Sequence, residues 1–116
     1  MRSRNPIIQP PSRRRRDAGL TASLIHLHLL HHAGEAPIFG LEMIEELGRH
    51  GYALSAGTMY PILHRLEEDG LLRSKVVLAR DGRRRRLYRL TPTGRRALRA
   101  AKQKVRELFG ELFEHA

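Results

Sequence analysis

Arginines dominate the residues of this chain that could take part in binding chemistry. Four of them, Arg83, Arg84, Arg85 and Arg86, follow the dipeptide Asp81-Gly82, and six more lie within residues 1–17. Guanidinium groups match phosphate geometry, and no acidic run near Arg83–Arg86 in sequence could neutralise them. With a formal net charge of +10, the chain is predicted to bind a polyanion, either nucleic acid or an acidic membrane surface. The alternative is that the positive charge only keeps the protein in solution.

A second group consists of histidines, namely His26, His28, His31 and His32. On a helix, His28 and His32 would share one face at a spacing that can hold a metal ion. A metalloprotease helix would also need a glutamate after the first histidine, where Leu29 stands, and no carboxylate lies inside the cluster. We therefore interpret these residues as partly buried or interface histidines, with pH sensitivity of a dimer as an alternative. No metal or cofactor is predicted.

Other catalytic chemistry is not indicated. Without cysteine the chain has no disulfide, thiol nucleophile or cysteine-ligated zinc. It has no nucleophile elbow, phosphate-binding glycine loop or carboxylate pair, so an enzyme is not expected. No stretch is apolar enough to span a membrane, and no apolar segment with a cleavage site follows the basic N-terminus. A cytoplasmic protein is the expectation.

The pattern of apolar residues and breakers predicts a mainly α fold with a small β-hairpin. Residues 20–33 form a helix stopped by Gly34, residues 40–48 form a second helix, and a third runs from the N-cap Ser55 to Gly70. Pro61 predicts a kink or a late start of that helix, with Thr58 as a second cap. Strands at 71–79 and 85–90 flank the Asp81-Gly82 turn, and the final helix starts at the cap Thr91 and runs to about Glu114.

Two short helices joined by a tight turn, followed by a basic hairpin, are typical of a winged helix-turn-helix. Met43, Ile44 and Leu47 form the inner face of the second helix, and Met59, Ile62, Leu63 and Leu66 that of the third. Domain boundaries follow from this order: a disordered basic arm at 1–17, the winged helix at 18–91 and a C-terminal helix at 92–116.

The final helix carries an apolar seam at steps of three and four residues, and the first helix is apolar on several sides. A chain of 116 residues cannot cover both faces of a helix on the order of 35 Å long. We therefore predict a homodimer; the alternative is that the seam packs only on its own domain. The predicted dimerisation residues are Leu20, Leu24, Leu98, Ala101, Val105, Leu108, Phe109, Leu112 and Phe113.

Three segments resemble a known family. The sequences Gly40-Leu-Glu-Met-Ile, Ser55-Ala-Gly-Thr-Met-Tyr-Pro-Ile-Leu-His-Arg-Leu-Glu-Glu-Asp-Gly-Leu and Arg86-Leu-Tyr-Arg-Leu-Thr-Pro-Thr-Gly-Arg are similar to the PadR family of bacterial transcriptional regulators. The resemblance covers roughly residues 24–98. It implies a winged-helix DNA-binding domain, a C-terminal dimerisation helix and repressor activity, often relieved by a small aromatic or multidrug-like molecule.

Carried over to this chain, the resemblance implies that the start of the third helix and the hairpin contact DNA. The implied DNA-binding residues are Ser55, Thr58, Tyr60, Pro61, His64, Arg83, Arg84, Arg85 and Arg86. Arg65 is added because it lies next to His64, a turn further along the same helix. Arg65 has a second interpretation, since it could pair with Glu68 or Asp69 on its own helix. Leu41 stands where the family usually has an aromatic residue. The chain has no tryptophan, which argues against a flat aromatic drug as the effector and leaves other ligands open.

The sequence thus predicts a sequence-specific regulator that binds an inverted-repeat operator in double-stranded DNA as a homodimer. Two other classes stay open. A basic RNA-associated protein would usually offer stacking aromatics, of which this chain has only three Tyr and three Phe. A winged helix that had become a protein-interaction module would not need the hairpin arginines. Whether the N-terminal arm lies on DNA or is a solvated tail is equally open.

Overall fold

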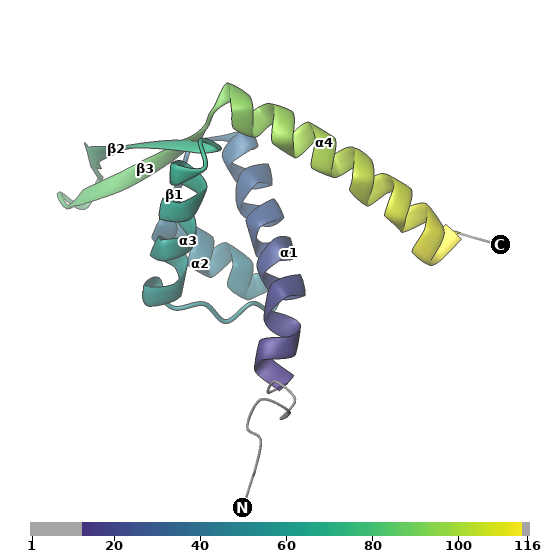
Figure 1. Ribbon diagram of the computed structural model, residues 1–116. Coiled ribbons are helices and arrows are strands. Elements are labelled where there is room, and N and C mark those ends of the chain that lie inside the picture. Colours follow the sequence, from purple (N-terminus) through teal and green to yellow (C-terminus); the bar gives the residue numbers. More distant parts are fainter. Residues whose placement is uncertain (1–12, 115–116) are drawn as a thin grey trace, which may run out of the picture.

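Four helices and a small antiparallel sheet make up the structure, a computed structural model shown in Figure 1. It describes residues 13–114, with side chains from residue 19 onward. The elements are α1 (Arg13–Glu35), β1 (Ile38–Phe39), α2 (Gly40–Arg49), α3 (Ala56–Glu68), β2 (Leu72–Leu78), β3 (Arg84–Leu90) and α4 (Pro92–Phe109), followed by a π-helical turn at Gly110–Glu114. The predicted fold class is confirmed: a mainly α chain with helix, turn, helix and hairpin in the expected order.

Helix α1 is longer than predicted at both ends. It includes residues 13–17, which we had assigned to a disordered arm, whereas residues 1–12 lie outside the described residues. At the other end it continues through Gly34 to Glu35, because Gly34 does not adopt the left-handed conformation of a helix stop. A Cβ at Gly34 would lie 3.3 Å from Leu90 Cδ2, so this glycine serves close packing instead. The helix ends just before Ala36-Pro37, since a residue before proline disfavours helix.

Helix α3 starts at Ala56 and contains Pro61, so the predicted late start and the second cap at Thr58 are wrong. The backbone N–H groups of Thr58 and Met59 both donate to the carbonyl of Ser55, at 3.1 and 2.9 Å, which begins the helix ahead of the proline. Ser55 is the N-cap as predicted. Its hydroxyl, however, donates to Thr58 Oγ1 at 3.3 Å and not to the backbone.

The sheet has one strand more than predicted, because β1 pairs with β3 and gives the order β1-β3-β2. Ile38 lies opposite Tyr88 on one side, and Ser74 of β2 lies opposite Tyr88 on the other. Two residues are too few for an alternating pattern, so β1 could not be recognised from the sequence. The strand places Gly40 and the start of α2 beside the hairpin.

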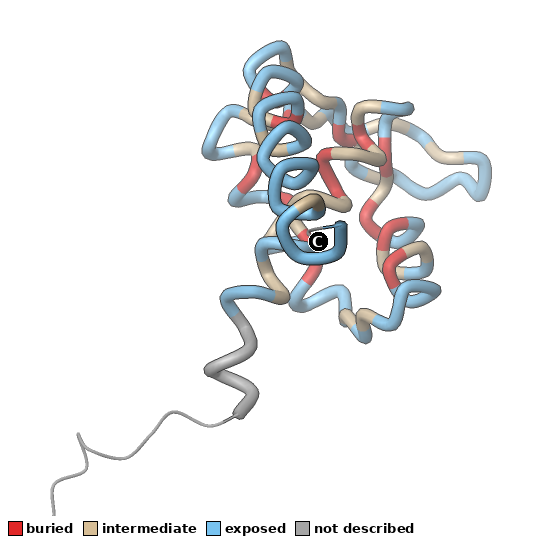
Figure 2. The backbone as a smooth tube through the Cα atoms, turned by 90° about the vertical axis from the view of Figure 1, so that its right-hand side faces the viewer, coloured by how far each residue is buried: buried red, intermediate tan, exposed pale blue. Residues whose placement is uncertain are grey.

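Buried side chains gather where the three N-terminal helices meet the base of the sheet, as Figure 2 shows. The predicted inner faces of α2 and α3 are confirmed, since Met43, Leu47, Met59, Leu63 and Leu66 are buried. The two remaining members, Ile44 and Ile62, are partly buried and pack against this core. The core is completed by Ile25, Leu29, Leu30, Ala33, Ile38, Leu72, Tyr88 and Leu98. The hairpin tip and most of α4 remain outside this core.

The junction between the hairpin and α4 is closely packed. As predicted, Thr91 caps α4, and its hydroxyl accepts from the backbone N–H of Gly94 at 2.8 Å. A Cβ on Gly94 would lie 2.1 Å from the carbonyl oxygen of Leu71, so the site admits only glycine without a shift of the backbone. None of the helices between residues 13 and 114 combines the length and the apolar character that a membrane crossing requires.

Candidate nucleic-acid interface and subunit surface

The first turns of α3 present polar groups to solvent. Ser55, Thr58 and Pro61 are exposed, whereas Met59 and Leu63 on the opposite face are buried. This division follows from the helical period, which turns the apolar positions toward α2 and leaves the hydroxyls outside. The hydroxyls of Ser55 and Thr58 can each donate or accept a hydrogen bond, as contacts to phosphates or base edges require.

Tyr60 lies against the start of α2, and Gly40 makes this possible. A Cβ at position 40 would come within 2.6 Å of Tyr60 Cε1. The atoms of Tyr60 nearest to this position are Cε1, Cζ and the hydroxyl oxygen, so the hydroxyl end of the ring lies beside Gly40, and Tyr60 as a residue is 37% exposed. Gly40, which the sequence suggested only as part of a family motif, therefore positions a candidate DNA-binding side chain.

The next turn of α3 carries a histidine and an arginine that already have partners. His64 Nε2 lies 3.4 Å from Glu68 Oε2, and Arg65 Nε lies 3.6 Å from Asp69 Oδ1. All four side chains are more than half exposed. Of the two interpretations of Arg65, the structure records the pair with Asp69. Such exposed pairs are worth about 0.3–0.5 kcal/mol, so a phosphate could displace the carboxylate.

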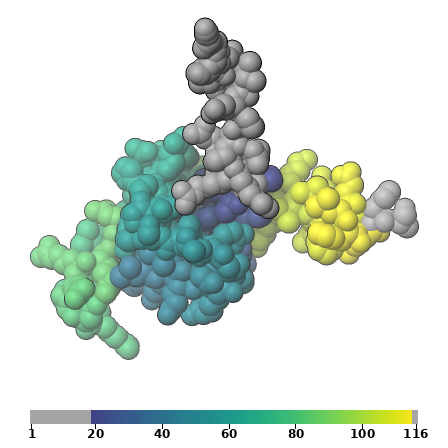
Figure 3. All heavy atoms as spheres, turned by 90° about the horizontal axis from the view of Figure 1, so that it is seen from below, coloured from purple at the N-terminus to yellow at the C-terminus, as the bar shows by residue number. Residues whose placement is uncertain are grey.

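We call the hairpin from Leu72 to Leu90 the wing. Its tip is a turn in which the N–H of Gly82 donates to the carbonyl of Ala79 at 3.0 Å and Gly82 has a φ of 83°. Figure 3 shows the wing extending from one side of the molecule and the end of α4 from the other. No residue between Lys75 and Leu87 is buried, so the tip depends on its own ladder of hydrogen bonds and on the bonds that Asp81 accepts within the turn.

The four consecutive arginines of the wing, Arg83 to Arg86, are not equivalent. Arg85 Nη2 donates to Asp81 Oδ2 at 2.5 Å, and Arg86 Nη1 donates to Ser74 Oγ at 3.1 Å. The hydrogen bond from Arg85 is the main reason that the pKa of Asp81 is lowered, so this aspartate stays ionised and neutralises one of the cations. Within the described part of the chain, neither Arg83 nor Arg84 has a carboxylate within 4.0 Å. These two arginines have the most freedom to bind an external anion.

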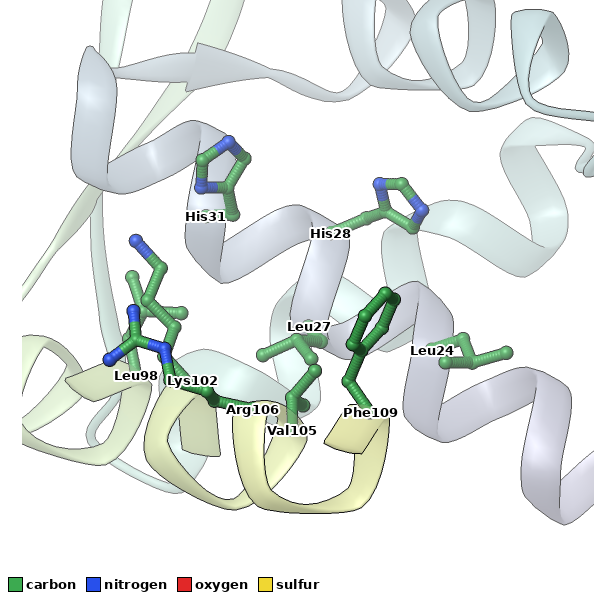
Figure 4. Close-up of a pocket in the computed structure, with 9 residues that line it drawn as sticks. All are labelled: Leu24, Leu27, His28, His31, Leu98, Lys102, Val105, Arg106 and Phe109. Atoms are coloured by element: carbon green, nitrogen blue, oxygen red, sulfur yellow. The ribbon is translucent and has the colours of Figure 1, made fainter. Parts of the chain in front are cut away.

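On the opposite side, α1 and α4 enclose an apolar groove of about 610 Å³. Figure 4 shows Leu27, Val105 and Phe109 turned into the space between the two helices, with Lys102 and Arg106 along its edge. Leu24, His28, His31 and Leu98 complete its lining. The helices are close at the start of α4 and separate toward its end (Figure 1), which leaves the groove open.

Most of the predicted dimerisation residues are uncovered in the single chain. Val105, Leu108 and Phe109 are 47–51% exposed, and Leu20, Leu24, Leu112 and Phe113 are 53–76% exposed. Leu98 is different, because it is 6% exposed and belongs to the core of its own chain. Its assignment to the dimer surface is therefore corrected. Ala101 is partly buried.

Two of the four predicted cluster histidines, His28 and His32, lie beside the end of α2 and the turn after it. The ring of His28 has its centroid 4.9 Å from that of His50 and 6.2 Å from that of His32, and it meets Tyr52 edge-on. His32 and His50 both approach Glu46 Oε2, at 3.7 and 3.3 Å. Burial, followed by the neighbouring histidines, lowers the pKa of His28. Among the described residues, no set of three or more side chains has the geometry of a metal site.

Three contributors to these surfaces were not identified from the sequence: Gly40, Asp81 and His50. Only Asp81 had a local signal, since aspartate in a turn commonly accepts from the backbone two residues on, as it does here from Arg83 N at 3.0 Å. The others depend on contacts between segments far apart in the chain, for which spacing in the sequence gives no indication.

Comparison with known proteins agrees with this arrangement. Residues 29–100 match the transcriptional regulator PadR-like family. The transcriptional regulator Rv3488 of Mycobacterium tuberculosis is 51% identical over 90 residues, which cover 74% of this chain and 83% of that protein. The crystal structure of a PadR family regulator from Eggerthella lenta is 29% identical, with a TM-score of 0.65 over 85% of this chain and 93% of its own. A PadR-like factor from Bacteroides fragilis shares the fold, with a TM-score of 0.73 over 86% of this chain and 97% of its own at 24% identity.

Proposed function

Because the chain belongs to the PadR-like family of transcriptional regulators, which are not enzymes, we propose that it is a homodimeric repressor that binds an inverted-repeat operator in double-stranded DNA. One observation carries this proposal: a polar helix start and an arginine-tipped wing lie on one side of the molecule, and an uncovered apolar surface lies on the other. The first surface fits a polyanion, and the second fits another copy of the chain.

DNA recognition is assigned to α3 and the wing. The start of α3 enters the major groove, where Ser55, Thr58 and Tyr60 contact base edges or phosphates. Arg83 and Arg84 reach the sugar-phosphate backbone or the adjacent minor groove, whose narrow A·T stretches attract arginine. Arg85 and Arg86 contribute less, since each already has a partner in its own chain.

The dimer forms through α1 and α4. Burying the remaining exposed part of each apolar side chain on this surface contributes about 1 kcal/mol. The surface has seven large members on α1, α4 and the π-helical turn that follows α4, all roughly half exposed or more. Two copies related by a twofold axis place two α3 helices about 34 Å apart, one turn of the double helix. The groove between α1 and α4 is also where a small-molecule effector would bind and release the DNA.

The test is footprinting of the full chain on the DNA upstream of its own reading frame, together with sedimentation of the free protein. Protection of two half-sites one turn apart by a dimer is the expected result. Binding that prefers structured RNA would favour an RNA-associated protein. A lack of any salt-dependent duplex binding would favour a protein-interaction module. Acting on chromosomal DNA, the regulator would be cytoplasmic.

A further inference from the structure

Between α3 and the wing lies a second groove, of about 580 Å³, lined by Tyr60, His64, Glu67, Arg86 and Tyr88. Glu67 shares a helix face with Tyr60 and His64, at steps of three and four residues, so it borders the surface assigned to DNA. A carboxylate there repels phosphates and by itself lowers DNA affinity. Its presence at this position therefore requires a compensating role.

The carboxylate of Glu67 binds the wing at its base. Glu67 Oε2 accepts from the backbone N–H of Ser74 at 2.9 Å, and Oε1 accepts from the Ser74 hydroxyl at 2.7 Å. The same hydroxyl oxygen accepts from Arg86 Nη1 at 3.1 Å, across the ladder on β3. These hydrogen bonds, with that to the Ser74 side chain as the largest cause, keep the pKa of Glu67 below its ordinary value. Glu67 is thus ionised at neutral pH.

Ser74 lies near the end of the supported part of the wing, since β1 pairs with β3 only as far as Leu87, the ladder partner of Lys75. Its ladder partner Tyr88 is 3% exposed and packs in the core, whereas no residue from Lys75 to Leu87 is buried. The strand rises about 3.3 Å per residue, so Leu78 lies about 13 Å beyond Ser74. A rotation of about 15° at Ser74 would displace the tip by about 3.5 Å, more than the tolerance of a hydrogen bond to phosphate.

We propose that Glu67 is a positioning residue that holds the wing at a fixed angle to the recognition helix through Ser74, so that α3 and the wing arginines engage the duplex together. This inference rests on the proposed DNA-binding function and adds a residue to it. Two charge-assisted hydrogen bonds at the base of the wing restrict its rotation. Arg86 Nη1 donates to the hydroxyl oxygen of Ser74, so the link continues from β2 to β3.

The test compares Glu67→Ala with Glu68→Ala, a matched control that removes the neighbouring carboxylate, which contacts His64 and no wing residue. The wild-type chain first selects a preferred duplex from random-sequence DNA, and each variant is then titrated with that duplex and with a random one. Glu68→Ala is expected to strengthen binding to both duplexes by a few fold. The ratio of the affinity for the preferred duplex to that for the random duplex should stay unchanged. Glu67→Ala is expected to lower the ratio about tenfold.

Two further variants separate positioning from charge and from folding. Glu67→Gln keeps a carbonyl oxygen for the Ser74 N–H and is expected to restore the ratio while losing the repulsion. Ser74→Ala removes the hydroxyl and is expected to give a partial loss in a chain with an unchanged α3. If Glu67→Ala does not fold, the affinity ratios of Glu67→Gln and Ser74→Ala test the proposal. A Glu67→Ala variant that behaves like Glu68→Ala, or a Ser74→Ala variant with a wild-type ratio, would overturn the proposal.

Hydrogen exchange of the free protein gives a readout without DNA. Amides of β2 and β3 beyond Ser74 are expected to exchange at least several-fold faster in Glu67→Ala than in Glu68→Ala, and unchanged rates would contradict the link. A wild-type chain that selects no duplex would contradict the proposed DNA binding. If the exchange difference is still found in that case, the proposal that Glu67 positions the wing stands.

Discussion

The wing and α4 both extend from the core, yet their chemistry is opposite. At the wing tip guanidinium ions dominate, although Val76 and Leu78 of β2 are also exposed, whereas α4 has exposed cations on one side and exposed leucine, valine and phenylalanine side chains in its seam. Cations at an exposed tip lose little solvation and attract a polyanion from a distance. Exposed apolar side chains on a helix gain free energy only when another apolar surface excludes water. Two projections of similar exposure are therefore assigned to partners of different kinds, DNA and a second copy.

The wing and α4 meet at the Thr91–Gly94 junction, so a substitution there should affect both elements. Gly94→Ala places a Cβ about where the Leu71 carbonyl oxygen lies, so we expect the free energy of unfolding to fall by about 3 kcal/mol or more. Urea unfolding measures this change. Gly48→Ala is the control, because nothing lies within 4 Å of its Cβ and alanine in a helix should stabilise by up to about 1 kcal/mol. Equal unfolding midpoints for the two variants would contradict the close packing at residue 94.

The apolar projection is tested by Leu108→Glu combined with Phe109→Glu. Charges in the seam cannot be buried, so the chain should sediment as a monomer, and operator affinity should fall by about 100-fold because two linked recognition helices bind far better than one. Gln103→Glu, on the polar face of α4, should leave both properties unchanged. A double variant that remains dimeric would show that the contact lies elsewhere.

The cationic projection is tested by Arg83→Ala combined with Arg84→Ala. We expect about 10- to 100-fold weaker binding to every duplex, with a dimer that is unaffected. If each arginine contacts one phosphate, a dimer loses four contacts and the slope of log affinity against log salt falls by about 3.6. Titration at several salt concentrations measures this. Arg49→Ala, whose guanidinium pairs with Glu45 and Glu46, is the control, and a slope that does not change would exclude the wing tip from the contact.

A smaller change within the wing concerns the aspartate that neutralises Arg85. Asp81→Asn keeps an oxygen for the N–H of Arg83 but removes the charge. Arg85 should then be free to contact phosphate, and binding to all duplexes should strengthen by several fold at low salt. Asp69→Asn on α3 frees Arg65 in the same way and serves as a comparison. Weaker binding by Asp81→Asn would mean that the ion pair is needed to shape the tip.

The smallest expected effect is on pH dependence, near the apolar projection. The folded pKa of His28 is lowered, so the unfolded chain binds a proton first as the pH falls through about 6.5. The free energy of unfolding should therefore decrease below that pH. Unfolding at pH 7.5 and 5.5 measures it. His28→Gln should reduce the change in the free energy of unfolding between these two pH values, whereas His64→Gln, outside the cluster, should not. The same pH dependence in both variants would rule out His28 as the cause.

Much of the architecture is local in origin and could be predicted. The N-cap at Ser55, the stop at Gly70, the Asp81-Gly82 turn and the Thr91-Pro92 start each depend on the conformational preferences of a few adjacent residues. Helical periodicity likewise identified the inner faces of α2 and α3 and the apolar seam of α4. The nature of each surface follows from residue types alone, which is why an arginine tip and an apolar helix could be assigned before their placement was known.

Other features depend on which distant segments meet, and only the folded chain decides them. Leu98 carries the periodicity of the seam but packs in the core, and Gly34 continues a helix because Leu90 and Leu98 need its space. Arg85 and Arg86 look identical to Arg83 and Arg84 in the sequence, yet Asp81 and Ser74 engage them. No periodicity in the sequence links Glu67 with Ser74, which lie seven residues apart, one on a helix and the other on a strand. Hydrogen bonds and close packing act over a few ångströms, and those distances are set by the tertiary fold.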